Sequence, residues 1–169
     1  ARGRVVYYAR SAQHPVMAAH LAGGEAGVYI EDDRIVVADG KQVMEVVDLA
    51  RVEFTVEGKI EFQVMNALAA TAAAWAAGLN PAMIARALTT FVTDELSVPG
   101  RFNRMELHGI ELILDYGHNQ AALAALGQAV QALEPRRTIM AITLPGDRRD
   151  EDMDESLTAT LSYVDEYIL

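Results

Sequence analysis

The feature that most constrains the fold is an alternation of apolar strands and helices in the C-terminal part of the sequence. Short apolar runs at residues 110–114 and 138–142 are each followed by a helical pattern, at residues 120–133 and from about 152 to 163. A further strand is expected at residues 164–169. Strands that alternate with helices favour a parallel sheet covered by those helices. We therefore predict an α/β fold with a doubly wound parallel sheet for this part of the chain.

The first half of the sequence mixes strand and helix patterns. A buried strand is expected at residues 4–8, and two apolar runs within residues 27–38 are separated by a turn, which predicts a β-hairpin. Residues 64–77 are rich in alanine, leucine and methionine, and Gly78 stands at a position where many helices end. Asn80 is expected to cap the next helix, since a proline follows it.

A connector that contains proline and glycine, residues 97–100, separates the two patterns. We place a domain boundary there, with residues 1–98 in one domain and residues 99–169 in the next. The sequence starts on one strand pattern and stops inside another, whereas natural termini usually fray outside such elements. We therefore expect the chain to be a piece of a longer polypeptide.

The charge and composition of the chain argue against two classes of partner. There are 24 acidic and 14 basic residues, so the formal net charge is −10, and a surface of this sign repels nucleic acid and anionic lipid. The longest apolar stretch, Ala67 to Leu79, is shorter than the roughly 20 residues that a membrane span needs. The absence of cysteine is compatible with a reducing compartment. We expect a cytoplasmic protein without nucleic-acid or membrane partners.

Two polar clusters follow the apolar runs at residues 110–114 and 138–142. The first extends from Asp115 to Asn119, and the second from Pro145 to Asp152. In an open parallel sheet, ligands bind outside the carboxyl ends of the strands. If the two strands run in the same direction, both clusters lie on one rim of the sheet and form a candidate site.

Each of these residues also has a purely structural interpretation. Asp115 could cap a turn, His118 could bond to the backbone, and Asn119 suits the N-cap of the helix that follows. Gly146 could serve a tight turn. The charges of residues 147–152 could pair locally, at about 0–1 kcal/mol per exposed pair.

Arg101, in the connector, and Asn66, inside the alanine-rich helix, are further candidates. Arginine suits multidentate contacts with phosphate, and an asparagine within a helix requires a polar partner. A solvated arginine and a local bond of Asn66 are the alternatives. His14, His20 and His108 show no spacing typical of metal ligands, so we expect no dedicated zinc site.

Several of these segments resemble the Mur ligase superfamily in their order and spacing. That superfamily includes peptidoglycan-precursor ligases, folylpolyglutamate synthases and cyanophycin synthetases. The segment GDRRDED, residues 146–152, resembles the cyanophycin synthetase branch most closely. The other matching segments are FQVMNALAA (62–70), PGRFN (99–103) and DYGHN (115–119).

The resemblance implies a fold and an activity. Residues 1–98 would end a central ATPase domain, and residues 99–169 would begin a Rossmann-like C-terminal domain with a parallel sheet. In such ligases ATP phosphorylates a substrate carboxylate, and an amine attacks the acyl-phosphate. Cyanophycin synthetases add arginine to the aspartate side chains of a poly-aspartate backbone. ATP and Mg²⁺ are the implied cofactors, an amino acid or peptide is the implied substrate, and the complete enzyme is compatible with a homo-oligomer.

The resemblance also implies roles for single residues. Asn66 would contact the adenine side of ATP, and Arg101 would meet the phosphates or the ribose. Asp115 would meet the nucleotide as the C-terminal domain closes. His118 and Asn119 would line the same cleft, with His118 and Arg101 as the catalytic residues. The implied substrate-binding residues are Gly146, Asp147, Arg148 and Arg149.

Two departures from the family pattern stand out. Gln120 occupies a position where the family often has proline. The sequence also contains no G-x-x-x-x-G-K-[ST] phosphate-binding loop, and the usual magnesium ligands are mostly outside it. We therefore expect these 169 residues alone to be inactive. The alternatives are a peptidoglycan-precursor (UDP-N-acetylmuramoyl-peptide) ligase, a folylpolyglutamate ligase, or a non-catalytic module with the ligase fold.

Overall fold

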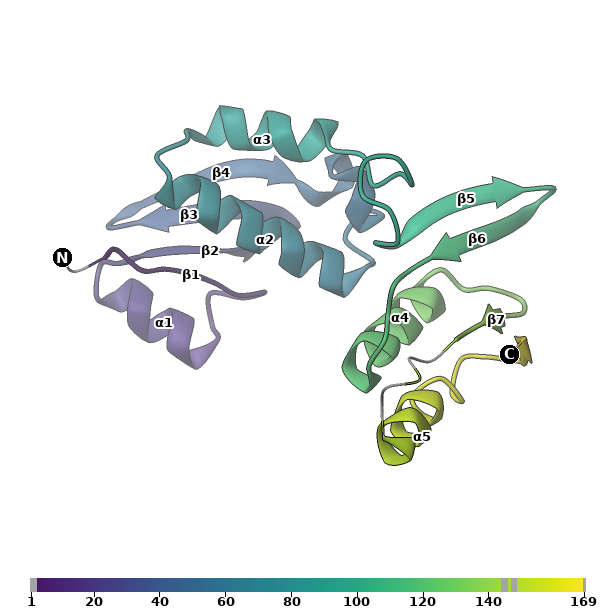
Figure 1. Cartoon of the computed structure of the whole chain (residues 1–169). Helices are drawn as coiled ribbons and strands as arrows, with labels where there is room; N and C mark the ends of the chain where they lie inside the picture. Colours follow the sequence, from purple (N-terminus) through teal and green to yellow (C-terminus); the bar gives the residue numbers. More distant parts are fainter. Residues whose placement is uncertain (1–2, 144–145, 147–148, 169) are drawn as a thin grey trace. The chain divides into compact units, whose positions relative to one another are not determined.

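The computed structural model describes residues 3–143, 146 and 149–168. The chain divides into two compact units, residues 1–92 and 93–169 (Figure 1). The assignment of residues 1–98 and 99–169 to two ligase domains stays a prediction. Among the described residues, no helix combines the length and the apolar character that crossing a bilayer requires.

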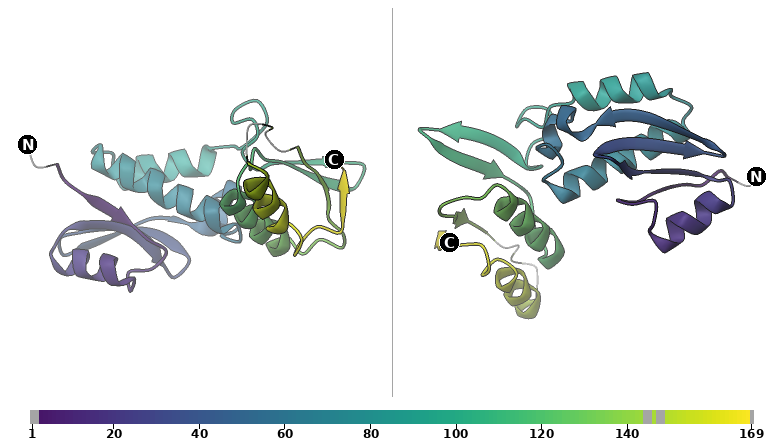
Figure 2. Two further views of the ribbon diagram at one scale, coloured as in Figure 1. Left: turned by 60° about the horizontal axis from the view of Figure 1, so that its bottom comes forward. Right: turned by 180° about the vertical axis from the view of Figure 1, so that it is seen from behind.

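The N-terminal unit is a four-stranded sheet with helices on both faces. Its helices and strands are β1 (Val6–Tyr8), α1 (Pro15–Ala22), β2 (Ala26–Glu31), β3 (Arg34–Asp39), β4 (Gln42–Asp48), α2 (Glu61–Ala76) and α3 (Pro81–Thr90). Two short 3-10 turns, η1 (Leu49–Arg51) and η2 (Glu53–Thr55), connect β4 to α2. Strand β1 is parallel to β2, and β2, β3 and β4 pair antiparallel. Helices α2 and α3 cover one face of the sheet and α1 covers the other (Figure 2).

The main core of this unit lies between the sheet and helices α2 and α3. Val37 of β3 is fully buried there with Leu68 of α2 and Ile84 of α3. On the opposite face, Val36 of β3 belongs to a second cluster, against which Leu21 of α1 packs. Strand β3 is therefore buried on both faces, which explains its continuous apolar run.

The predicted helix ends in this unit are confirmed. Helix α2 closes on Ala77, and Gly78 follows with φ of +88°, a conformation that glycine adopts without steric cost. Asn80 caps α3, and its Oδ1 accepts a hydrogen bond from the Met83 amide at 2.9 Å. Both signals are local, so they act regardless of how the rest of the chain folds.

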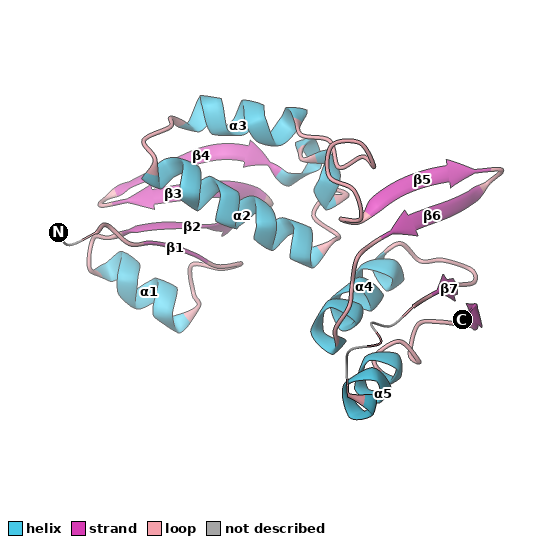
Figure 3. Ribbon diagram, in the orientation of Figure 1, coloured by secondary structure: helices cyan, strands magenta, loops and turns pink. Residues whose placement is uncertain are grey.

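The C-terminal unit combines an antiparallel hairpin with a parallel strand pair. Its elements are β5 (Asn103–Leu107), β6 (Ile110–Leu114), α4 (Gln120–Ala132), β7 (Ile139–Ala141), α5 (Asp150–Thr158) and β8 (Glu166–Ile168). Strands β5 and β6 pair antiparallel (Figure 3), and β7 and β8 pair parallel. The α/β class predicted from the sequence is confirmed.

One expectation about the sheet of this unit needs correction. The strand at residues 110–114 was expected to join a parallel sheet, but it pairs antiparallel with β5, which the sequence pattern had not indicated. His108 and Gly109 both have positive φ, +52° and +79°, which suits the two-residue turn of a tight hairpin. Among the described residues, β6 shares no ladder with β7. The single doubly wound sheet through residues 110–114 is therefore not observed.

Helix α5 also differs from its prediction, because it ends at Thr158 rather than near Tyr163. Turns follow the helix, and they place Tyr163 against α4, where its hydroxyl donates to the Leu123 carbonyl at 2.9 Å. Burial raises the pKa of Tyr163 to about 12. The tyrosine ring lies against Gly127, at a distance that only a residue without a side chain permits.

Candidate functional site

Asn103 organises the segment that carries Arg101. The segment from Thr93 to Phe102 contains no helix or strand (Figure 3). The fully buried Asn103 carboxamide spans it: Nδ2 donates to the Thr93 and Val98 carbonyls, each at 3.0 Å, and Oδ1 accepts from the Gly100 amide at 2.7 Å. Hydrogen bonds from a side chain to backbone groups therefore replace the backbone–backbone hydrogen bonds that a helix or strand would provide in this segment.

Asp115, directly after β6, ties a second loop to the first. Its Oδ2 accepts from the Phe102 amide at 2.9 Å, and its Oδ1 accepts from the Gly117 amide at 2.8 Å. The Tyr116 amide donates to the Gly100 carbonyl at 2.8 Å. The loop at residues 100–102 and the loop at residues 115–117 therefore lie side by side.

Arg101 sits between two residues whose backbone is held in the left-handed region. Gly100 has φ of +70° and Phe102 has φ of +56°. A non-glycine residue rarely adopts this conformation, so the buried Phe102 ring and the Asp115 bond must offset the strain. The Arg101 side chain is exposed, and within residues 3–143, 146 and 149–168 it forms no hydrogen bond or ion pair. Its guanidinium is therefore available to an anion.

Tyr116 and His118, which lie between Asp115 and α4, form an aromatic pair. The ring of Tyr116, which is 65% exposed, lies 5.2 Å from the His118 ring between centroids. His118 Nδ1 is 3.2 Å from the Tyr116 carbonyl oxygen, so a protonated Nδ1 would donate to it and leave Nε2 for other contacts. Asn119 caps α4, with Oδ1 accepting from the Ala122 amide at 2.9 Å.

The second polar cluster is only partly described. Gly146 lies in a turn, Arg149 precedes α5, and the predicted site residues Asp147 and Arg148 lie outside the described residues. Arg149 donates to both carboxylate oxygens of Asp152, at 3.0 and 2.6 Å, and this hydrogen bonding raises the pKa of Arg149 above its ordinary value. Local pairing, one of the two interpretations open from the sequence, thus occurs at Arg149. Because β6 and β7 share no ladder among the described residues, the expected common rim is not established.

Asn66 belongs to the N-terminal unit. It lies on an exposed position of α2, and its Nδ2 donates to Gln63 Oε1 at 3.1 Å. The local bond expected for an asparagine inside a helix is therefore present. The amide oxygen of Asn66 remains able to accept a further hydrogen bond.

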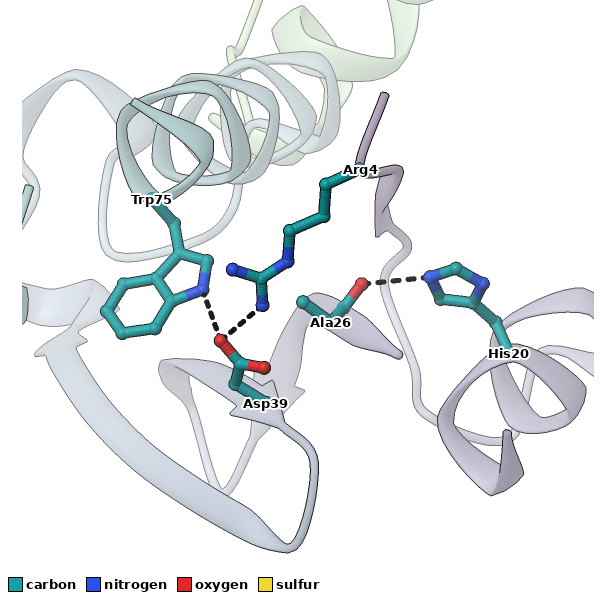
Figure 4. A network of polar contacts seen from close by, with 5 residues as sticks. All are labelled: Arg4, His20, Ala26, Asp39 and Trp75. Atoms are coloured by element: carbon teal, nitrogen blue, oxygen red, sulfur yellow. Dashed lines mark hydrogen bonds and ion pairs between the residues drawn. The ribbon is translucent and has the colours of Figure 1, made fainter. Parts of the chain in front are cut away.

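A second polar network in the N-terminal unit was not anticipated from the sequence (Figure 4). Asp39, at the end of β3, pairs with Arg4, and its Oδ2 accepts from Trp75 Nε1 of α2 at 3.1 Å. The Arg4 hydrogen bond, supported by that of Trp75, holds the pKa of Asp39 below its usual value against the opposing effect of burial. Beside it, His20 Nε2 lies 3.0 Å from the Ala26 carbonyl oxygen. The two bonds of Asp39 join segments distant in sequence, which points to a structural role.

Sequence comparison relates this chain to a family of ligases. Residues 100–169 match the family described as Mur ligase, glutamate ligase domain. The cyanophycin synthetases of Synechocystis sp. (strain PCC 6803) and Geminocystis herdmanii are 32% and 30% identical to this chain over 91% and 90% of its length. The chain spans only 18% and 17% of those two relatives. A UDP-N-acetylmuramate–L-alanine ligase of Xylella fastidiosa (strain 9a5c) is 35% identical, over 72% of this chain and 29% of its own length.

Structural comparison supports the same fold. The structure of E. coli FolC in complex with DHPP and ADP superimposes with a TM-score of 0.61, at 21% sequence identity, over 98% of this chain and 39% of that chain. At this identity the likeness concerns the fold alone. The α/β architecture deduced from the sequence therefore has a counterpart among solved structures.

Proposed function

This chain belongs to the Mur ligase superfamily, and we propose that the whole protein is an ATP-dependent acid–amino-acid ligase of the cyanophycin synthetase type. The reaction transfers the γ-phosphoryl group of ATP to a carboxylate oxygen and releases ADP. The amine nitrogen then attacks the acyl carbon, an amide bond forms, and inorganic phosphate leaves. The carboxylate is proposed to be an aspartate side chain of poly-aspartate, and the amine to be supplied by arginine.

The nucleotide part of this proposal rests on the exposed side chain of Arg101. Two anchored residues flank it, and its guanidinium has no partner among the described residues. A planar guanidinium is well suited to phosphate oxygens and to ribose hydroxyls. We propose that Arg101 contacts ATP and that its positive charge stabilises the charge that develops during phosphoryl transfer.

The neighbouring residues are proposed to contribute in different ways. His118 offers Nε2 as a donor or acceptor beside the nucleotide, and Asn119 orients the first turn of α4, whose free amides favour anions. Both oxygens of Asp115 already accept backbone amides, but each retains a lone pair that can accept a ribose hydroxyl. In the N-terminal unit, Asn66 is proposed to contact adenine through its amide oxygen.

The substrate and metal parts of the proposal rest on the family alone. The residues proposed to contact the substrate are Gly146, Asp147, Arg148 and Arg149. Arg149 would first have to break its two hydrogen bonds to Asp152. Among the described residues, no group of three or more acidic or histidine side chains could hold a metal ion. Mg²⁺ is therefore proposed as a cofactor on the family resemblance alone, and none of the described residues is proposed as its ligand.

The Arg101 assignment is tested by Arg101→Ala in the whole protein, with ADP release measured over a range of ATP concentrations. Loss of a charge-assisted contact should raise the KM for ATP by about 10- to 100-fold, the equivalent of roughly 1.5–3 kcal/mol. Arg104→Ala is the matched control, because Arg104 is a nearby arginine on β5 that already pairs with Glu111. Equal KM values in the two variants would contradict the role of Arg101.

The substrate assignment is tested by the co-substrate that ATP consumption requires. Dependence on both a poly-aspartate primer and arginine supports the cyanophycin synthetase type. Dependence on a UDP-sugar acceptor would instead favour a peptidoglycan-precursor ligase, which the 35% identity to the Xylella enzyme keeps as the second candidate. Folate-dependent consumption would favour a folylpolyglutamate ligase. A whole protein without ATP turnover would favour a non-catalytic module.

A further inference from the structure

Asn103 uses the full hydrogen-bonding capacity of its amide nitrogen in a fully buried position. Both Nδ2 hydrogens are engaged, by the Thr93 and Val98 carbonyls, while Oδ1 accepts from the Gly100 amide. An isosteric carboxylate in the same place could accept from Gly100 but could not donate to the two carbonyls. The site therefore requires a carboxamide and not merely a polar side chain of this shape.

Three hydrogen bonds, one of them from Asn103, hold the backbone on either side of Arg101. Gly100 is held by Asn103 through its amide and by Tyr116 through its carbonyl, while Phe102 is held by Asp115. These two residues carry the left-handed backbone conformations that set the path of the chain on either side of Arg101. Without the Asn103 bond, Gly100 would regain the wide range of conformations open to glycine.

We propose that Asn103 is a positioning residue for nucleotide binding, which acts through the backbone of residues 100–102 to hold the Arg101 guanidinium where the phosphates bind. This inference rests on the proposed function and adds a residue that does not itself contact ATP. A displacement of a binding group by about 1 Å can reduce a rate by about 100-fold, so a bond remote from the ligand can have a large kinetic effect.

The same segment contains a matched control. Asp94 Oδ1 accepts from the Leu96 and Ser97 amides, at 3.1 and 2.6 Å, so Asp94 also stabilises the segment, but its bonds do not reach Gly100. The Ser97 amide bond is the main reason why the pKa of Asp94 lies below its usual value. Asp94→Ala removes two side-chain bonds to backbone in the same segment and leaves those that flank Arg101.

The experiment compares Asn103→Asp, Asn103→Ser and Asp94→Ala in the whole protein, and measures KM for ATP and kcat separately. Both Asn103 variants should raise the KM for ATP by about tenfold or more, while their KM for the amine substrate stays within about twofold of that of the unsubstituted protein. The KM of the Asp94 variant for ATP should also stay within about twofold. Serine keeps a neutral donor, so Asn103→Ser provides the measurement if the buried charge of aspartate prevents folding. Circular dichroism verifies that each variant is folded.

The decisive measurement combines each Asn103 variant with Arg101→Ala. If Asn103 acts through Arg101, the double variant has the same KM for ATP as Arg101→Ala alone, because the two residues then belong to one unit. Losses that multiply, or Asn103 variants with an unchanged KM for ATP, would overturn the positioning role while ATP turnover by the unsubstituted protein upholds the proposed function. No ATP turnover by the unsubstituted protein would overturn the proposed function and this inference together.

Discussion

At the scale of single residues, Asp39 shows how a polar side chain connects distant segments. Arg4 precedes β1, Asp39 ends β3, and Trp75 lies near the end of α2, yet the three side chains meet at one carboxylate (Figure 4). A hydrogen bond to a charged group contributes more than one between neutral groups, although exposure of Arg4 weakens the ion pair. The network therefore stabilises the N-terminal unit by a modest amount.

The pKa of Asp39 makes this contribution dependent on pH. The carboxyl has a lower pKa in the folded chain than in the unfolded chain, so its stabilisation is complete above the unfolded pKa of about 3.9 and is lost as the pH falls through the folded pKa. Asp39→Asn should lower the free energy of unfolding by about 1–2 kcal/mol at pH 7, and this difference should shrink below about pH 4.

Urea unfolding of both proteins between pH 3 and pH 7 measures the effect. The exposed Glu25 provides the control substitution, Glu25→Gln, which should leave the free energy of unfolding nearly unchanged. A difference between Asp39→Asn and the unsubstituted chain that stays constant over this pH range would show that the carboxylate charge is not responsible.

At the scale of secondary-structure elements, the packing of α4 depends on Gly127. A Cβ atom at this position would lie 2.2 and 2.3 Å from Cε1 and Cδ1 of Tyr163, much closer than atoms can approach. The tyrosine ring is rigid and its hydroxyl is bonded to the Leu123 carbonyl, so it cannot easily turn away. The glycine therefore serves close packing, even though glycine is a poor residue for the inside of a helix.

Gly127→Ala sets two effects against each other. The gain in helix propensity is about 1 kcal/mol, whereas overpacking against a ring typically costs about 1–3 kcal/mol. With a clash this severe, we expect net destabilisation and a lower thermal midpoint for the C-terminal unit, measured by circular dichroism. Gln128→Ala, on the exposed side of the same helix, should have little effect. A Gly127→Ala variant more stable than the unsubstituted chain would mean that Tyr163 does not pack as described.

At the scale of the whole molecule, the two units differ in how much apolar surface they bury. Among the described residues, all buried apolar side chains except Phe102, Leu123, Ala129 and Tyr163 belong to the N-terminal unit. In the C-terminal unit, several large apolar side chains are exposed, including Ile110, Leu112 and Ile139. Burial of apolar surface is the main favourable contribution to folding. The N-terminal unit is therefore expected to be the more stable of the two.

Equilibrium unfolding of the 169-residue chain in urea should separate the two units. Trp75, the single tryptophan, lies in the N-terminal unit, so its fluorescence reports on that unit, while far-UV circular dichroism reports on helices of both. We expect part of the circular dichroism signal to be lost at lower urea concentration than the tryptophan signal. Coincident transitions would instead indicate one cooperative unit.

Several features of the fold and of the candidate site could be predicted from local sequence. Gly78 marks a helix end through its own backbone preference, and Asn80 and Asn119 do so through bonds to amides three residues away; the structure confirms all three. The polar run after residue 114 is confirmed as a loop that precedes α4. The contributions of Arg101 and His118 to nucleotide binding stay predictions, since no contact within the chain tests them.

Local sequence was sufficient to predict most helices and strands of the chain, because capping, turn residues and apolar periodicity act over a few neighbouring positions. It did not indicate β5. The pairing of β6 with β5, and the bonds by which Asn103 and Asp115 hold the backbone around Arg101, depend on long-range packing. A strand offers hydrogen bonds along both edges, and a carboxamide or carboxylate can bond to any amide or carbonyl group that folding brings within reach. Such partners depend on how the chain packs, so residue types alone do not specify them.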